Sequence, residues 1–347
     1  MPLELPRPSA AVLVALVVVA LLGAIFARVA GARAGSPPAA AFPYLSSEAL
    51  RYDRVNAAGH ERREILLLGS SLVRHGFIEE QLERDLADSS LRVFNAGLDG
   101  AGMWATLRLL RRMDPPRPRG PNVAILEVNR KEMRTGREPD PWGEAQLARR
   151  GLAPDGRAPA SALLVRARRA WAVHPPRQTL EGWVEELRLG WLAEHVPGVV
   201  STPEPQPRAL WTASAIARRR AVRDMLPEIE ARRLEHWRLD EGEVIALREV
   251  VAELHHRGYR VVLFVAPMHS RYRSTVRAYP DFVNTERRFQ AMLHDPAIGA
   301  DRVLEIPDAR ALGESDSIFV DYGHLTRHGA SVQTRWVAGW LARNGIS

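Results

Sequence analysis

The chain has 347 residues, of which 46% are hydrophobic, so it can bury the core of a large domain and is not an intrinsically disordered chain. The formal net charge is +7, carried almost entirely by arginine, because Lys131 is the only lysine. The arginines are scattered along helix-like segments without a compact basic motif, so we expect solvated helix faces and no nucleic-acid partner. The absence of cysteine excludes disulfides, thiolate nucleophiles and cysteine-ligated metals.

An uninterrupted apolar run without charge covers residues 10–27 and has arginines on both sides. It is long enough to span a bilayer, and we predict an N-terminal transmembrane anchor within residues 1–33. A cleaved signal peptide is the alternative, because residues 30–34 offer small residues at processing spacing. Either segment delivers the rest of the chain out of the cytoplasm. Residues 34–61, with prolines and several alanines, are predicted to be a linker between membrane and domain.

From residue 62 to 347, short apolar runs alternate with helical patterns. This alternation predicts a three-layer α/β/α domain with a mostly parallel five-stranded sheet. The predicted strands cover residues 64–68, 91–94, 122–128, 259–265 and 302–306. The predicted helices cover residues 78–87, 103–112, 285–293, a stretch capped at Asp240 and ending at Gly258, and a terminal stretch to about 344.

A segment of different character, about 131–240, interrupts this alternation. It contains arginine-rich helical patterns, six tryptophans and proline breaks, with no convincing strand. We interpret it as a helical insertion that covers the site or binds a partner. Its tryptophans fit sugar stacking, but packing in a core or at the membrane interface is the more common use of this residue.

Polar residues suited to acyl transfer follow the predicted strands. A serine hydroxyl becomes a nucleophile when a base takes its proton, and a histidine oriented by a carboxylate is the usual base. Backbone and side-chain amides can then stabilise the oxyanion. A plain Gly-Ser-Ser turn without chemistry is the alternative for the first strand end. In strand order the candidates are Ser70 and Ser71, then Gly100, then Asn129, and finally Asp321 with His324.

The glycine-rich turn of residues 95–102 follows the second predicted strand. Its spacing lacks the Gly-x-Gly-x-x-Gly pattern of a dinucleotide site, so we predict no such cofactor. A turn whose backbone amides approach a ligand is the more economical interpretation.

The order of these residues resembles the four motif blocks of the SGNH (GDSL-like) hydrolase superfamily, over residues 62–130 and 240–345. The resemblance implies a serine nucleophile at Ser71, oxyanion donors at Gly100 and Asn129, and catalytic Asp321 and His324. Only the register of the family motif favours Ser71 over Ser70. The blocks read Gly69-Ser70-Ser71, Asn95-x-Gly97-x-x-Gly100, Asn129, and Asp321-x-x-His324-Leu325.

Two residues depart from the superfamily pattern. Ser70 stands where aspartate is frequent, and Glu127 stands where the third block often has glycine. A charged side chain beside an oxyanion opposes its negative charge unless it points away. The serine, the anchor and the helical insertion are together similar to branches that modify cell-surface polymers, namely alginate O-acetylation proteins and the D-alanine transfer protein of teichoic acids.

The expected function is therefore a membrane-anchored, extracytoplasmic serine esterase or O-acyltransferase. The resemblance implies an acylated carbohydrate or lipid of the cell envelope as substrate. The apolar run predicts membrane contact through residues 10–27. Partner proteins of an envelope assembly fit the same setting. The alternative is a catalytically inactive scaffold or polysaccharide-binding subunit of such an assembly.

The remaining polar residues give weaker expectations. His269 follows the fourth predicted strand, on the same edge as the site, and with Ser70 is a candidate for substrate contact; a surface-loop histidine is the alternative. His255 and His256 suit the end of a helix. Histidines and carboxylates do not show metal-ligand spacing, so we predict neither a metal nor another cofactor.

Overall fold

The computed structural model describes residues 45–57, 62–88, 90–113, 122–134, 237–278 and 282–346. The anchor predicted at residues 10–27 and nearly all of the insertion predicted at 131–240 lie outside these ranges. Within them, every helix is too short or too polar to cross a bilayer.

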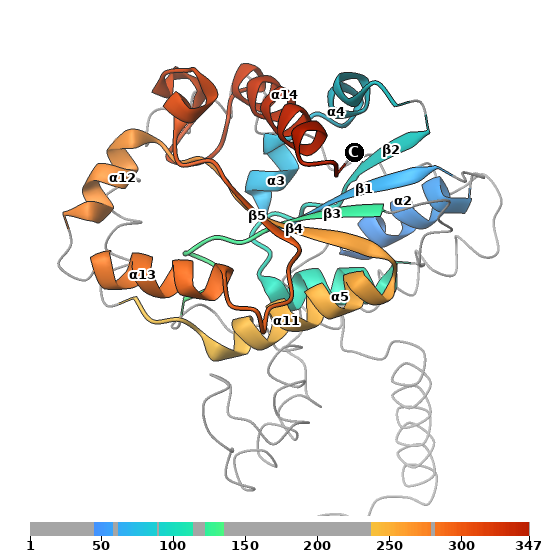
Figure 1. The fold of residues 1–347 in the computed structure, drawn as a ribbon, viewed down its shortest axis with the longest axis horizontal. Coiled ribbons are helices and arrows are strands. Elements are labelled where there is room, and N and C mark those ends of the chain that lie inside the picture. The colour runs from blue at the N-terminus through green and yellow to red at the C-terminus, as the bar shows by residue number, and fades with distance from the viewer. Residues whose placement is uncertain are drawn as a thin grey trace, which may run out of the picture.

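Five parallel strands form a single sheet at the centre of the domain (Figure 1). Their order is β2-β1-β3-β4-β5. The strands are β1 (Arg63–Leu68), β2 (Leu91–Asn95), β3 (Asn122–Glu127), β4 (Tyr259–Val265) and β5 (Arg302–Glu305). The α/β class and the five predicted strands are confirmed, since each apolar run forms one strand of the sheet.

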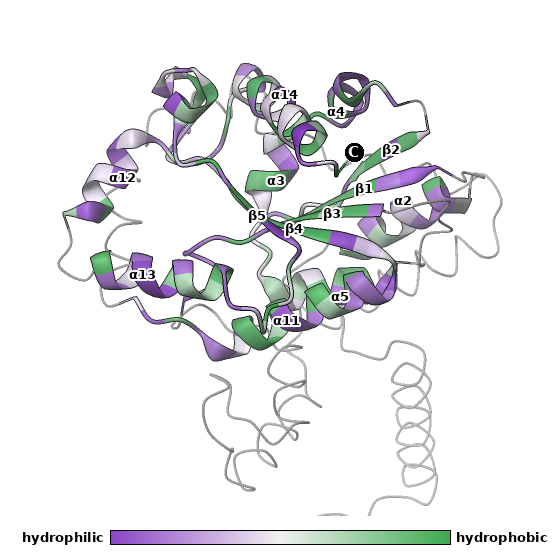
Figure 2. Cartoon of the chain, viewed as in Figure 1, coloured by the Kyte–Doolittle hydropathy of each residue, from purple (hydrophilic) through white to green (hydrophobic). Residues whose placement is uncertain are grey.

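Helices cover both faces of the sheet (Figure 1). Successive side chains of a strand point to opposite faces, so Leu66 and Leu68 of β1 join one apolar core, and Ile65 and Leu67 join the other. The strands are accordingly hydrophobic over most of their length (Figure 2). On the first face lie α2 (Leu45–Ala57), α5 (Met103–Arg112), α11 (Glu241–His256) and α13 (Phe282–Leu293). On the second lie α3 (Ser71–Gly76), α4 (Glu79–Leu86) and α14 (Arg327–Arg343).

Helix α2 corrects the linker predicted at residues 34–61. Leu45 and Tyr52 are each only 1% exposed and pack in the core beneath the sheet, with Ala49 between them. These residues are spaced four and three apart, which forms an apolar stripe on one helix face. Residues 45–57 therefore belong to the domain, and the prediction of a linker is wrong for them.

The predicted helix start at Asp240 is confirmed, and Glu243, three residues later, contacts a different helix. The Asp240 carboxylate accepts from the backbone amides of Gly242 and Glu243 and caps α11. The Glu243 side chain accepts instead from the Met103 amide at 2.8 Å. It thus supplies a cap to α5, whose own N-cap residue, Gly102, has no side chain for that purpose.

Candidate active site

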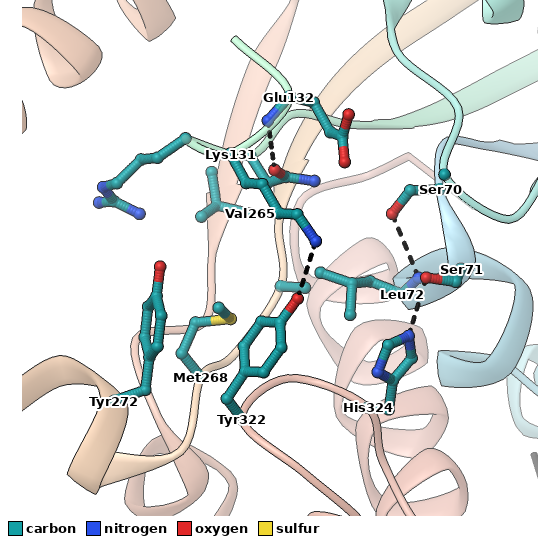
Figure 3. A pocket seen from close by; sticks show the side chains of 14 residues that line it. Ser70, Ser71, Leu72, Lys131, Glu132, Val265, Met268, Tyr272, Tyr322 and His324 are labelled. Atoms are coloured by element: carbon teal, nitrogen blue, oxygen red, sulfur yellow. Dashed lines mark hydrogen bonds between the residues drawn. The ribbon is translucent and has the colours of Figure 1, made fainter. Parts of the chain in front are cut away.

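A cavity of about 90 Å³ lies beyond the carboxyl ends of the strands (Figure 3). Here the strand order changes direction, because the chain moves from β1 outward to β2 and then returns to the other side of β1 with β3. Such a crevice is where open α/β sheets bind ligands. Its wall combines apolar groups, among them Leu72, Val265 and Met268, with five residues predicted from the sequence: Ser70, Ser71, Gly100, Asn129 and His324.

A hydroxyl, an imidazole and a carboxylate form a continuous chain of contacts at this cavity. Ser71 Oγ lies 2.8 Å from His324 Nε2, and His324 Nδ1 lies 2.8 Å from Asp321 Oδ2. Asp321 is fully buried behind the ring, while His324 is 7% exposed. The structure thus brings together three residues that the sequence places up to 253 positions apart.

The negative charge of Asp321 determines which nitrogen of His324 carries a proton. Burial alone raises the pKa of the Asp321 carboxyl, but the hydrogen bond and charge of His324, with the Gly323 and His324 amides, outweigh it and lower the pKa below its usual range. An ionised carboxylate only accepts hydrogen bonds, so His324 Nδ1 carries the proton toward it. In the neutral ring Nε2 then has a free lone pair, which accepts from the Ser71 hydroxyl.

The loop that carries Asp321 and His324 is held on both sides. The Asp321 carboxylate accepts from the His324 backbone amide at 2.8 Å, which closes a local turn in addition to holding the ring. The backbone bridge between Phe319 and Leu325 joins the two arms of the loop. Thr326 then caps α14 by accepting from the Gly329 amide. The imidazole is therefore mounted between a closed turn and a helix start.

The two serines of the first turn have different partners. Ser70 is the N-cap of α3, its hydroxyl accepts from the Leu72 amide at 3.3 Å, and it contacts the Glu127 carboxylate at 2.8 Å. Ser71 is the first residue of α3 and faces His324. Because an amide at a helix start has no intrahelical acceptor, the Ser71 N–H points away from its own helix. The geometry thus separates two hydroxyls that the sequence leaves equivalent.

Asn129 and Gly100 complete the rim of the cavity. Asn129 Oδ1 accepts from the Glu132 amide at 2.9 Å, and its Nδ2 donates to Glu127 at 2.7 Å. Gly100 has φ of +73°, a conformation that glycine adopts without strain. Both residues line the same cavity as Ser71. Gly100 follows β2 and Asn129 follows β3, and these strands are the two neighbours of β1.

The loop before Gly100 is locked against α3. The Asn95 side chain donates to the carbonyls of Val73 and Arg74 and accepts from the Gly97 amide. A Cβ on Gly97 would lie 2.6 Å from the Arg74 backbone nitrogen. Glycine at this position therefore permits the close approach of the loop to the helix.

A second histidine–aspartate pair, which the sequence analysis missed, lies beside His324. His75 Nε2 is 3.3 Å from Asp99, and its ring centroid is 6.3 Å from that of His324. Burial lowers the pKa of His75 below its ordinary value, although the contact with Asp99 acts in the opposite direction. Its position four residues after Ser71, on the same helix face, was the available signal.

His269 lies outside the lining of the cavity. It is the N-cap of α12 (Ser270–Arg277), where its Nδ1 accepts from the Arg271 amide at 3.1 Å. The structure therefore gives this residue a capping contact in place of the predicted position at the cavity. Within the described ranges, histidines and carboxylates do not gather in groups of three that could hold a metal ion.

We compared the chain with known proteins. No model of a protein family matches it, and no curated protein matches it.

Proposed function

We propose that the chain is a serine esterase or O-acyltransferase of the SGNH type that forms an acyl-enzyme on Ser71. The observation that carries the proposal is the Ser71–His324–Asp321 chain, with both contacts at 2.8 Å, at the wall of a cavity. The strand order 2-1-3-4-5 is that of flavodoxin-like α/β/α domains. This is the type of sheet that the resemblance to the superfamily implies.

In the first half-reaction, the Ser71 oxygen attacks the carbonyl carbon of an ester and its proton passes to His324 Nε2. Asp321 stabilises the imidazolium that forms. The Ser71 backbone amide, the Asn129 side chain and the Gly100 segment surround the oxyanion and stabilise it. Collapse of the tetrahedral intermediate breaks the bond to the leaving alcohol, which takes the proton from His324.

In the second half-reaction, water or a hydroxyl of an acceptor attacks the acyl group on Ser71. His324 takes the proton of the attacking group and returns it to Ser71 as the ester bond breaks. Hydrolysis and transfer use the same residues and differ only in which acceptor reaches the acyl-enzyme. The apolar side chains of Leu72, Val265 and Met268 form a wall of the cavity that excludes water from the acyl group.

We further propose an acylated carbohydrate or lipid of the cell envelope as substrate, with the domain held outside the cytoplasm by residues 10–27. The support is the charge-free apolar run at these positions and the resemblance to polymer-modifying branches of the superfamily. Partner proteins of an envelope assembly belong to the same proposal.

A serine-directed fluorophosphonate and a short-chain aryl ester test the proposal on the purified full-length chain. We expect the wild type to be labelled and to hydrolyse the ester. Ser71→Ala abolishes labelling, whereas Ser70→Ala, the matched control, retains it, because only the Ser71 hydroxyl faces His324. A wild type that is neither labelled nor active would overturn the proposal and favour a scaffold role.

A further inference from the structure

Glu127 is a buried carboxylate at the last residue of β3. It is 1% exposed and has no ion pair among the described residues. Burial raises its pKa, while hydrogen bonds from Asn129 and Ser70, and then the charge of His324, act in the opposite direction. A buried carboxylate is costly, so these hydrogen bonds are the larger part of the compensation for its position.

Among the described residues, all donors that reach Glu127 come from the two segments that form the candidate site. The Ser70 backbone amide donates to Oε2 at 2.7 Å, and the Ser70 hydroxyl contacts the same oxygen at 2.8 Å. The Asn129 side chain donates to Oε1 at 2.7 Å. One carboxylate thus joins the residue before Ser71 to the amide that lines the cavity.

These contacts determine which way the Asn129 amide faces. Its oxygen accepts from the Glu132 backbone amide at 2.9 Å, and one of the two hydrogens on its nitrogen goes to Glu127. A flipped amide would set its oxygen against the carboxylate, which only accepts hydrogen bonds. The second hydrogen on the nitrogen therefore has a fixed direction at the cavity wall.

The strand geometry explains where the Glu127 side chain points. Residues two apart on a strand point to the same face, and Val123 and Ile125 of β3 face the core that also contains Val73 of α3. Glu127 continues this face, directly under the Ser70–Ser71 turn. Its side chain therefore points at the turn rather than into the cavity.

We propose that Glu127 is a positioning residue, which orients the Asn129 amide and the Ser70–Ser71 turn so that their N–H groups meet at the oxyanion. The proposal rests on the acyl-enzyme function above. Glu127 itself does not touch substrate. It holds the groups that contact the oxyanion, so loss of Glu127 should lower the rate of the chemical step more than it weakens substrate binding.

The decisive variant is Glu127→Gln in the full-length chain, measured with the aryl ester. A carboxamide has the same shape but presents an NH₂ group to one of the three donors. We expect kcat per phosphonate-titrated site to fall about 10- to 100-fold, with KM changed less than about threefold, as for a misaligned oxyanion donor. Glu64→Gln is the matched control: this buried carboxylate lies at the opposite end of β1, and its loss should lower stability without changing kcat per titrated site.

Two further measurements separate positioning from a purely structural role. In combination with Asn129→Ala, Glu127→Gln should cause a smaller loss than it causes alone, because the Asn129 donor that it would misalign is already absent. If Glu127→Gln fails to fold, Ser70→Asp with Glu127→Gly provides the second test. Ser70 Oγ lies 2.8 Å and 3.0 Å from the two Glu127 oxygens, so an aspartate there returns a carboxylate to Asn129. The double variant should recover at least tenfold of the kcat lost in Glu127→Gly.

The possible outcomes are distinct. Wild-type kcat per titrated site in Glu127→Gln, independent losses with Asn129→Ala, or no recovery in the double variant would overturn the positioning role while leaving the esterase proposal intact. A wild type that is neither labelled nor active would overturn the esterase proposal, and the positioning role with it.

Discussion

Gly69 and Glu127 lie so close together that a Cβ on Gly69 would be 2.5 Å from Glu127 Cβ and 2.7 Å from its Oε2. The register explains the contact, because Leu68 of β1 pairs with Leu126 of β3 and the following residues are therefore neighbours. Gly69 also has φ of +146°, where a side chain is strained. The first turn of the site thus depends on a glycine beside a buried carboxylate.

We predict that Gly69→Ala destabilises the domain by about 2–5 kcal/mol, the sum of backbone strain and overpacking. Gly100→Ala is the matched control, because Gly100 also has positive φ, of +73°, but nothing lies within 4 Å of its added Cβ. Its expected loss is only about 1–2 kcal/mol. Urea unfolding measures both values, and equal losses would contradict the contact with Glu127.

A second prediction concerns Asp321→Asn. The amide keeps the shape of the side chain, but it can no longer hold the proton on Nδ1 or stabilise the imidazolium. We expect kcat for ester hydrolysis to fall roughly 10³- to 10⁴-fold, with the fold unchanged. Ester kinetics with circular dichroism as the folding control measure this change. A loss below tenfold would show that Asp321 does not act through His324.

The sheet could be predicted from sequence because its strands are continuous apolar runs bounded by charged residues or glycine. The run before Gly69 and the run 259–265 are buried on both faces, which a parallel sheet requires. Parallel strands then bring their carboxyl ends to one edge. This explains how Ser71 and Asn129 could be placed together from the sequence. His324 lies well beyond β5, and its placement came from the order of the superfamily motifs.

The rest could not be predicted, since it depends on contacts between distant segments. Ser70 and Glu127 each depart from the superfamily pattern, but they are 57 positions apart, and only the pairing of β1 with β3 shows that they contact each other. The same contact resolves the expected repulsion between Glu127 and an oxyanion, because the Glu127 side chain points at the Ser70–Ser71 turn and does not line the cavity. Helix α2 was missed since its apolar stripe is brief.

The lowered pKa of Asp321 predicts a pH dependence of stability. A carboxylate with a depressed pKa in the folded state contributes stability above its unfolded pKa, about 3.9, and this contribution is lost as pH falls through the folded pKa. The stability difference between wild type and Asp321→Asn should therefore begin to shrink below about pH 4, by on the order of 1 kcal/mol at pH 3. Urea unfolding at pH 6 and at about pH 3 tests this, and a difference that grows on acidification would contradict it.

Helix α2 predicts where the folded domain begins. A chain that starts at Arg62 loses Leu45 and Tyr52, each 1% exposed, and leaves their apolar contacts on the sheet open to water. Each such side chain contributes about 1.5–3 kcal/mol when buried. We expect this chain to unfold at least 10 °C below one that starts at Pro43, measured by thermal denaturation. Equal unfolding temperatures would show that α2 is dispensable.

The last prediction concerns the opposite end of the strands, where Glu64 is buried with Arg92. The two residues are paired across β1 and β2 and form an ion pair. The hydroxyls of Tyr52 and Tyr259 also donate to Glu64. Burial raises the pKa of both tyrosines the most, and the negative charge of Glu64 raises it further. Both phenols therefore keep their protons and remain hydrogen-bond donors.

Removal of Glu64 alone leaves the buried Arg92 guanidinium without its counter-charge. We expect Glu64→Leu to cost about 3–5 kcal/mol of unfolding free energy, and Glu64→Leu with Arg92→Met to recover most of that loss, because no charge then remains buried. Guanidinium chloride unfolding of the two variants and the wild type measures the difference. Phosphonate labelling of the folded fraction should be unchanged in both, since this network and the candidate site lie at opposite ends of β1. A double variant no more stable than Glu64→Leu would mean that the tyrosine hydroxyls, rather than the ion pair, make Glu64 indispensable.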